Sequence, residues 1–137
     1  MSKSIIVTGG SRGIGAATAR LAAQKGFAVC VNYQSAADAA NAVVADIKAA
    51  GGKALAVQAD VSNADDISRL FETAVNELGP LGAVINNGGI TGPLARLDET
   101  SAEDIRRTID VNLTGTALCC AEAVRRLSTK YGGPGGS

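Results

Sequence analysis

The sequence contains no histidine and no tryptophan, and only 2 tyrosines and 2 phenylalanines occur among its 137 residues. Without histidine the chain lacks both the usual general base and the commonest metal ligand, so we expect no metal site. The cysteines, Cys30, Cys119 and Cys120, are odd in number and form no C-x-x-C pair. This pattern argues against a disulfide framework and against a zinc site.

Long apolar runs and an excess of one charge are also missing. No run approaches the length of a membrane span, and the apolar stretch near the start is far too short for a signal peptide. Lys plus Arg and Asp plus Glu each total 13, a balance that argues against nucleic acid or a membrane surface as a partner. The sequence therefore predicts a cytoplasmic protein with reduced thiols.

Small aliphatic residues and glycine are abundant: 46% of the residues are hydrophobic and 17 are glycine. A chain of this length suits a single domain, so we expect residues 1–137 to build one core of Ala, Val, Ile and Leu. Strand and helix patterns alternate along the chain. Short apolar runs predict strands at 4–8, 27–32, 54–58 and 83–86.

Apolar residues at helical spacing follow each predicted strand, and the last such helix runs from about 101 to 130. Ser35 with Asp38 fits a capping box for the second helix. Two capping choices exist for each later helix: Ser62 with Asp65 or Asn63 with Asp66, and Thr100 with Glu103 or Ser101 with Asp104. The alternation predicts an α/β fold with a doubly wound, Rossmann-type parallel sheet in the order 3-2-1-4, ending before a fifth strand.

The last predicted helix carries more apolar surface than one face needs. One apolar stripe at helical spacing runs from Ile105 to Leu127, and Leu118 and Cys119 lie off it. We therefore expect this helix to be covered on two sides, partly by another subunit of a homo-oligomer. The bare edge of the fourth strand favours the same conclusion, because an uncovered edge invites pairing with another strand.

The densest glycine cluster, "TGGSRGIG", lies where the first strand turns into the first helix. Glycine there permits positive φ and lets the backbone touch a ligand. The start of the helix adds unpaired N–H groups and a positive dipole end, which suit a phosphate. A plain strand-to-helix turn needs fewer glycines, so a phosphate-binding loop is favoured.

The glycine spacing, T-G-x-x-x-G-x-G, resembles the fingerprint of the short-chain dehydrogenase/reductase family, and "QADV", "NNGG" and "DVNLTG" follow in the family's order. Gly88 stands where the family has alanine. The chain looks most like glucose dehydrogenases and 3-oxoacyl-carrier-protein reductases. The resemblance implies hydride transfer between a nicotinamide cofactor and a small-molecule carbonyl or alcohol substrate. The residues expected to contact the cofactor are Gly9, Ser11, Arg12, Gly13, Ile14, Gly15, Asn32, Tyr33, Asp60, Val61, Asn87, Gly88 and Gly89.

The identity of the cofactor depends on the end of the second strand. This end, "VNYQS", has no acid to bind the ribose 2′-hydroxyl of NAD. Asp38 is the nearest acid, but its capping role explains it better. Arg12 lies inside the glycine loop, where it could meet the 2′-phosphate of NADP or be an exposed loop charge. We therefore predict NADP, with NAD as the alternative.

Most of the family's catalytic group is missing from these residues. The family uses a Y-x-x-x-K pair, but neither Tyr33 nor Tyr131 has a lysine four positions later. The family's serine follows the fifth strand, so Ser137 does not match it. Asn112 alone matches, and the resemblance implies that it holds a water of the proton relay. An asparagine that bonds locally and bends its helix is the alternative.

We therefore expect the 137-residue chain to be inactive on its own. A non-catalytic NADP(H)-binding module, or pseudoenzyme, is the alternative to a part of an oxidoreductase. A methyltransferase that uses S-adenosylmethionine also has a Gly-rich first loop, but it usually requires an acid after the second strand. A P-loop NTPase is excluded, because G-x-x-x-x-G-K-[ST] does not occur.

Overall fold

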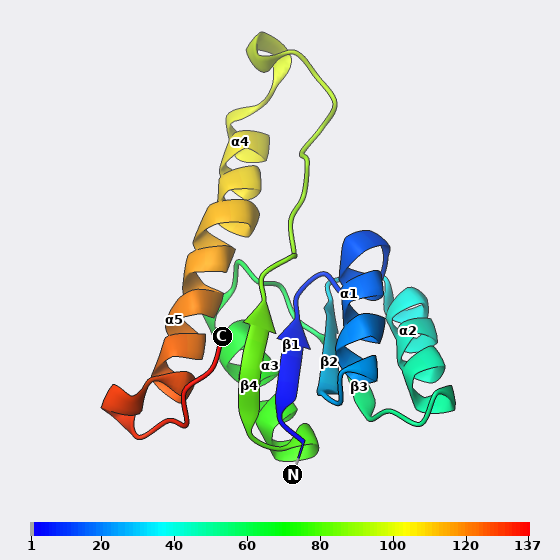
Figure 1. Ribbon diagram of the computed structural model, residues 1–137. Coiled ribbons are helices and arrows are strands. Elements are labelled where there is room, and N and C mark those ends of the chain that lie inside the picture. Colours follow the sequence, from blue (N-terminus) through cyan, green and yellow to red (C-terminus); the bar gives the residue numbers. More distant parts are fainter. Residues whose placement is uncertain (1) are drawn as a thin grey trace.

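A 4-stranded parallel sheet in the order β3-β2-β1-β4 forms the centre of the structure, a computed structural model that describes residues 2–137 (Figure 1). The strands are β1 Ser4–Val7, β2 Ala28–Tyr33, β3 Ala54–Gln58 and β4 Leu81–Ile85. Every neighbouring pair is parallel. The order and the direction of the strands confirm the predicted Rossmann-type fold.

Helices cover both faces of this sheet, α1 and α2 on one face and α3 and α5 on the other (Figure 1). Their bounds are α1 Gly13–Gln24, α2 Ala37–Ala49, α3 Ala64–Leu78, α4 Ala102–Ile109 and α5 Gly115–Leu127. A π turn at Asp110–Thr114 joins α4 to α5, and the two helices form one long rod whose α4 end extends beyond the sheet. Within residues 2–137, no helix is both long and apolar enough to cross a membrane.

Alternate residues of the strands enter two separate core clusters. Ile6 and Cys30 belong to the cluster under α3 and α5, which also contains the fully buried Phe71. Val7 and Val31 belong to the cluster under α1 and α2. This alternation is the period of a β-strand, and burial of both faces is typical of a parallel sheet.

The helix starts decide between the capping alternatives for α3 and α4. Asn63 caps α3, since its Oδ1 accepts a hydrogen bond from Asp66 N at 3.0 Å. Ser101 caps α4, since its Oγ accepts a hydrogen bond from Asp104 N at 3.0 Å. Each side chain thus satisfies one of the N–H groups that the start of a helix leaves unpaired.

The capping box predicted at Ser35 and Asp38 was wrong. The N-cap of α2 is Ala36, and no side chain bonds to the helix start there. Because the helix begins at Ala37, Asp38 stands at its second position, whereas a capping box needs its acid at the third. Ser35 lines a cavity instead.

The long last helix buries only the end of its predicted apolar stripe, at Leu127, and otherwise turns a different face to the core. The buried side chains on it are Val111, Cys119 and Leu127. The exposed apolar side chains are Ile105, Ile109, Leu113 and Val124. Gly115 allows the close approach of the buried face, since a Cβ there would come within 2.8 Å of Val61 O. The helix ends at Leu127, earlier than predicted.

The edge of β4, predicted to be bare, is partly covered by the last residue of the chain. Ser137 N donates to Gly82 O at 3.1 Å, and Val84 N donates to Ser137 O at 2.9 Å. This is the hydrogen-bond pattern of a parallel neighbour. The strand begins at Leu81 rather than at the predicted Ala83, because the side chain of Leu81 is buried in the core.

Candidate functional site

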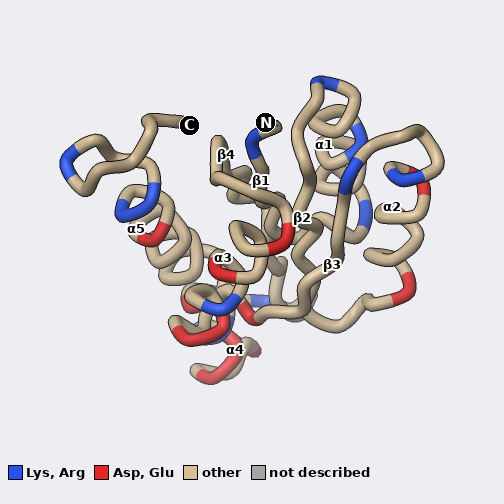
Figure 2. Tube along the Cα trace, turned by 90° about the horizontal axis from the view of Figure 1, so that it is seen from below, with Lys and Arg blue, Asp and Glu red and all other residues tan. Residues whose placement is uncertain are grey.

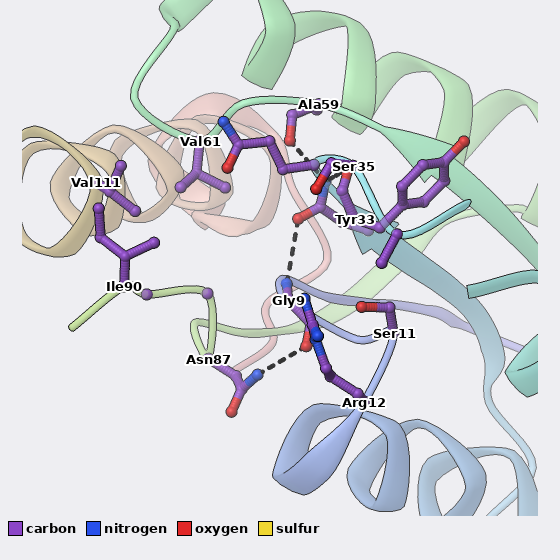
Figure 3. A pocket seen from close by; sticks show the side chains of 15 residues that line it. Gly9, Ser11, Arg12, Tyr33, Ser35, Ala59, Val61, Asn87, Ile90 and Val111 are labelled. Atoms are coloured by element: carbon purple, nitrogen blue, oxygen red, sulfur yellow. Dashed lines mark hydrogen bonds between the residues drawn. The ribbon is translucent and has the colours of Figure 1, made fainter. Parts of the chain in front are cut away.

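A cavity of about 310 Å³ opens at the carboxyl ends of the strands (Figure 3). It lies where the strand order switches between β1 and β4, the place at which open α/β sheets bind ligands. Its walls come from the glycine loop, from the loops after β2, β3 and β4, and from the π turn. The lining residues are Gly9, Ser11, Arg12, Asn32, Tyr33, Gln34, Ser35, Ala36, Ala59, Val61, Asn87, Gly88, Gly89, Ile90 and Val111.

Most of the residues expected to contact a cofactor lie in this lining. The exceptions are Gly13, Ile14, Gly15 and Asp60. Ile14 points to solvent with 79% of its surface exposed, while Gly15 is buried behind the loop. The lining residues outside the expected set are Gln34, Ser35, Ala36, Ala59, Ile90 and Val111, and of these Gln34 follows Tyr33 in the segment after β2 where an adenosine was expected. Most of them stand directly beside a predicted site residue, which is the sequence signal that could have found them.

The glycine loop needs its glycines both for backbone conformation and for close packing. Gly9 and Gly13 have φ of 59° and 55°, in the left-handed region that side chains disfavour. A Cβ at Gly15 would overlap Gly9 O and come within 2.6 Å of Asn87 Nδ2. The loop is therefore packed against the residues after β4 with no room for a side chain at this position.

Asn32 holds the glycine loop to the loop after β3, and its side chain is buried. Its Oδ1 accepts a hydrogen bond from Gly9 N at 3.2 Å. Its Nδ2 donates to Val57 O at 3.3 Å and to Ala59 O at 3.1 Å. Because the side-chain amide is used on protein atoms, Asn32 shapes the cavity wall and offers a ligand no free polar group.

Thr8 and Asn87 join the ends of β1 and β4. Thr8 Oγ1 accepts hydrogen bonds from Asn87 N and Gly88 N at 3.0 and 2.9 Å, and it donates to Ile85 O at 3.3 Å. Asn87 Nδ2 donates to Thr8 O and Gly9 O at 3.1 and 3.0 Å, and Figure 3 shows this amide turned toward the glycine loop. Thr8, for which no binding role was predicted, is thus the centre of this junction.

Asn112 lies in the π turn, and its side chain holds the loop after β4. Its Oδ1 accepts a hydrogen bond from Ile90 N at 2.8 Å, and its Nδ2 donates to Ile90 O at 2.7 Å. Its backbone oxygen accepts a hydrogen bond from Thr116 Oγ1 at 2.9 Å. The side-chain amide therefore fixes the position of a cavity-lining residue. Turns of this kind are frequent at functional sites.

The carboxylate of Asp60 is bonded to Ser62 and to Arg107 of α4. Arg107 Nη2 lies 3.0 Å from Asp60 Oδ2. Figure 2 shows acidic and basic residues on both α3 and α4. Burial raises the pKa of Asp60, but the hydrogen bonds from Ser62 and the hydrogen bond and charge of Arg107 lower it. The net result is a pKa below the ordinary value. Asp60 is thus held as an anion.

The stability of the protein should therefore fall when the solution is acidified. A carboxyl whose pKa is lowered by folding stabilises the fold above its unfolded pKa of about 3.9, and this stabilisation is lost as the pH falls through the folded value. We expect Asp60→Asn to lower the urea midpoint at about pH 7 and to flatten its decline between about pH 5 and 3. Glu72→Gln removes an exposed acid from the middle of α3 and is the control, whose decline should match that of the wild type. An undiminished decline in Asp60→Asn would contradict this role.

Arg12 is the one charged residue among those that line the cavity. It is also the N-cap of α1, where no side chain caps the helix and no acid stands in the first turn. The N–H groups at this helix start are therefore left for water or a ligand, and the charge and the helix dipole both favour an anion. Within residues 2–137, no group of three or more His, Cys, Asp or Glu side chains is placed to hold a metal ion.

Known proteins resemble nearly the whole chain. A family model described as short chain dehydrogenase matches residues 3–135. The 3-oxoacyl-[acyl-carrier-protein] reductase of Synechocystis sp. is 46% identical over 125 residues, which cover 91% of this chain and 50% of that protein. Glucose 1-dehydrogenase 2 of Bacillus subtilis is 42% identical over 125 residues, which cover 91% of this chain and 48% of that protein. These names confirm the likeness expected from the motifs.

A solved structure shows the same likeness in three dimensions. It is the crystal structure of a short chain dehydrogenase from Burkholderia cenocepacia in complex with NADP, with a TM-score of 0.85 and 37% sequence identity. The match covers 90% of this chain and 50% of that one. The chain thus spans about half the length of the relatives that it matches.

Proposed function

The chain belongs to the short-chain dehydrogenase family, and on that premise we propose that it forms the dinucleotide-binding part of an NAD(P)-dependent oxidoreductase. The complete enzyme would move a hydride between the nicotinamide and a carbonyl or alcohol carbon. The observation that carries this proposal is the cavity at the switch in strand order, with the glycine loop and the start of α1 in its wall. The reductase and dehydrogenase names of the relatives support the same chemistry.

The residues around the glycine loop fit a pyrophosphate. Ser11 and Arg12 line the cavity beside the uncapped start of α1, where backbone N–H groups lack partners. A Cβ at Gly9 would come within 2.9 Å of Gly88 Cα, so this position has no room for a side chain. A ligand would therefore meet only backbone atoms there. A bound nicotinamide cofactor would supply the hydride, while the backbone N–H groups of the glycine loop and of the start of α1 would bind its pyrophosphate.

The same lining favours NADP over NAD. It contains no acid to bind a ribose 2′-hydroxyl, and its one charge is the guanidinium of Arg12. Tyr33, Gln34 and Ser35 follow β2 and form the wall that an adenosine would meet. A 2′-phosphate placed beside these residues would be within the reach of an arginine, which binds phosphates through paired N–H groups. We take NADP as the cofactor that this wall recognises.

Replacing Arg12 tests the choice of cofactor. Hydrogen bonds to charged groups contribute about 1.5–3 kcal/mol, so we expect Arg12→Gln to weaken NADPH binding roughly tenfold. NADH lacks the 2′-phosphate and should bind both proteins alike. The measurement is a fluorescence titration of the purified 137-residue chain. Arg20→Gln, elsewhere on α1 and paired with Asp46 at 2.7 Å, is the control and should bind NADPH as the wild type does.

The same titration, extended to NADH and S-adenosylmethionine, tests which class of ligand the chain binds. Tighter binding of NADH than of NADPH would contradict the NADP assignment. Binding of S-adenosylmethionine without binding of either dinucleotide would contradict the oxidoreductase proposal itself. A non-catalytic NADP(H)-binding module is the second candidate, because the observed cavity accounts for cofactor binding alone. Binding without turnover by this chain is what both candidates share.

Two further features belong to this proposal. Asn112 is the residue of the family's catalytic group that is present, and we propose that it fixes the loop at Ile90 beside the nicotinamide end of the cavity.

The exposed apolar side chains of the long helix, Ile109, Leu113 and Val124 among them, support self-association through this helix in a cytoplasmic enzyme.

A further inference from the structure

Arg107 connects two walls of the cavity, although no binding or catalytic role was predicted for it. It belongs to α4, yet its guanidinium reaches the loop after β3, where Nη2 lies 3.0 Å from Asp60 Oδ2 and Nη1 lies 2.8 Å from Ser62 Oγ. The side chains of Arg107 and Asp60 are 40% and 27% exposed. The pair is therefore partly shielded from water, and it differs from the fully exposed ion pairs that contribute little to stability.

The carboxylate of Asp60 has no acceptor site left for a ligand. Its Oδ1 accepts hydrogen bonds from Ser62 N and Ser62 Oγ at 2.9 and 2.7 Å. Its Oδ2 accepts hydrogen bonds from Arg107 at 3.0 Å and from Gln34 Nε2 at 3.3 Å. An ionised carboxylate offers about four acceptor positions, and all of them are used here. Asp60 therefore serves as an anchor for Arg107.

The chain on either side of this anchor reaches the cavity. Val61 follows the anchored aspartate and lines the cavity, and Val111 lines it one turn after Arg107. Asn112 comes next and holds Ile90 through two hydrogen bonds of 2.8 and 2.7 Å. The segment 107–112 is thus tied to the loop after β3 at its first residue and to the loop after β4 at its last.

We propose that Arg107 is a positioning residue for cofactor binding, which braces the segment 107–112 between these two loops. Loss of the guanidinium frees one end of the brace, so the loop at Ile90 loses its support although Arg107 does not touch it. The cavity walls at Val61 and Ile90 are then no longer held at a fixed separation. This inference rests on the proposed binding of a nicotinamide dinucleotide.

The test compares Arg107→Gln and Arg107→Lys with Arg106→Gln in the 137-residue chain. Arg106 is the exposed neighbour on the same turn of α4 and serves as the matched control. Two quantities are measured: the Kd for NADPH by fluorescence titration, and hydrogen exchange at the amide of Ile90. Exchange at Val31 in the centre of the sheet reports global unfolding, so the ratio of the two rates isolates the loop.

Arg107→Gln should raise the Kd for NADPH roughly tenfold, because the loosened cavity walls must then be ordered when the cofactor binds. It should also raise the exchange rate of Ile90 relative to Val31 roughly threefold or more. Arg107→Lys keeps a charge but not the forked geometry, so both changes should be smaller. Arg106→Gln should leave both quantities at their wild-type values.

The outcomes separate this inference from the proposed function. If the wild-type chain binds no dinucleotide, the proposed function fails, and the exchange ratio still decides whether the brace exists. If the wild type binds NADPH while Arg107→Gln shows an unchanged Kd and an unchanged exchange ratio, the brace is refuted. If Arg107→Gln does not fold, Arg107→Lys is measured in its place: smaller increases in the Kd and in the exchange ratio support the brace, and unchanged values refute it.

Discussion

Gly15→Val should lower the free energy of unfolding by about 3 kcal/mol and abolish measurable NADPH binding. Helix propensity alone predicts the opposite sign, since valine is the better helix former. The structure reverses the sign because a Cβ at Gly15 would overlap Gly9 O, approach Asn87 Nδ2 to 2.6 Å and approach Gly10 Cα to 3.0 Å. Two of these atoms belong to the backbone, so only a shift of α1 away from the glycine loop relieves the overlap.

Ala17→Val is the matched control, because it adds a branched side chain to an exposed position of the same helix. We expect it to change the free energy of unfolding by no more than about 0.5 kcal/mol and to leave NADPH binding intact. Urea unfolding followed by circular dichroism gives the first quantity, and fluorescence titration gives the second. A Gly15→Val protein as stable as Ala17→Val would show that the close packing of the loop is wrong.

Thr8→Val should cost about 2 kcal/mol, although valine has almost the same shape. The hydroxyl of Thr8 accepts hydrogen bonds from Asn87 N and Gly88 N. Asn87 N also donates to Ile85 O at 3.1 Å, so it keeps an acceptor in Thr8→Val, whereas Gly88 N loses its partner. Each buried donor left without a partner costs about 1–3 kcal/mol.

Thr8→Ser separates the contribution of the hydroxyl to stability from that of the methyl group. It keeps the acceptor for both N–H groups and loses one buried methyl, so we expect a cost of only about 1 kcal/mol. Thermal unfolding of the two variants in parallel measures the difference between them. Equal losses in Thr8→Ser and Thr8→Val would mean that packing of the methyl group, and not the hydrogen bonds, holds the ends of β1 and β4 together.

The strand order could be predicted because the local patterns agree with one another. Each strand is a short buried apolar run, and each connection contains a helix long enough for a right-handed crossover. The start of β4 was harder to predict, because Leu81 follows Pro80 in "GPLG", which is typical of a turn. The π turn has no sequence pattern of its own. As a result, the part of the apolar stripe from Ile105 to Val124 was not recognised as an exposed face of the last helix.

The candidate site was predictable where backbone chemistry determines it and not where distant side chains meet. Positive φ and close packing both require glycine, so the glycine loop is visible in the sequence. The hydrogen bonds of Thr8 with Asn87 and of Arg107 with Asp60 join residues 79 and 47 positions apart. Nothing in the local sequence indicates which partner such a side chain will find, and only the folded sheet brings these pairs together.

The π turn changes the direction in which side chains point along the long helix. Gly115 N bonds to Asp110 O, one residue further back than in an α-helix. One extra residue rotates everything that follows by about 100° around the helix axis. Upstream of it Arg107 points to the loop after β3, and downstream Cys119 and Leu127 point into the core. Without that residue, the helix could direct Arg107 to the loop after β3 or Cys119 and Leu127 into the core, but not both. The one extra residue thus allows a single rod to serve both as a cavity wall and as a layer of the core.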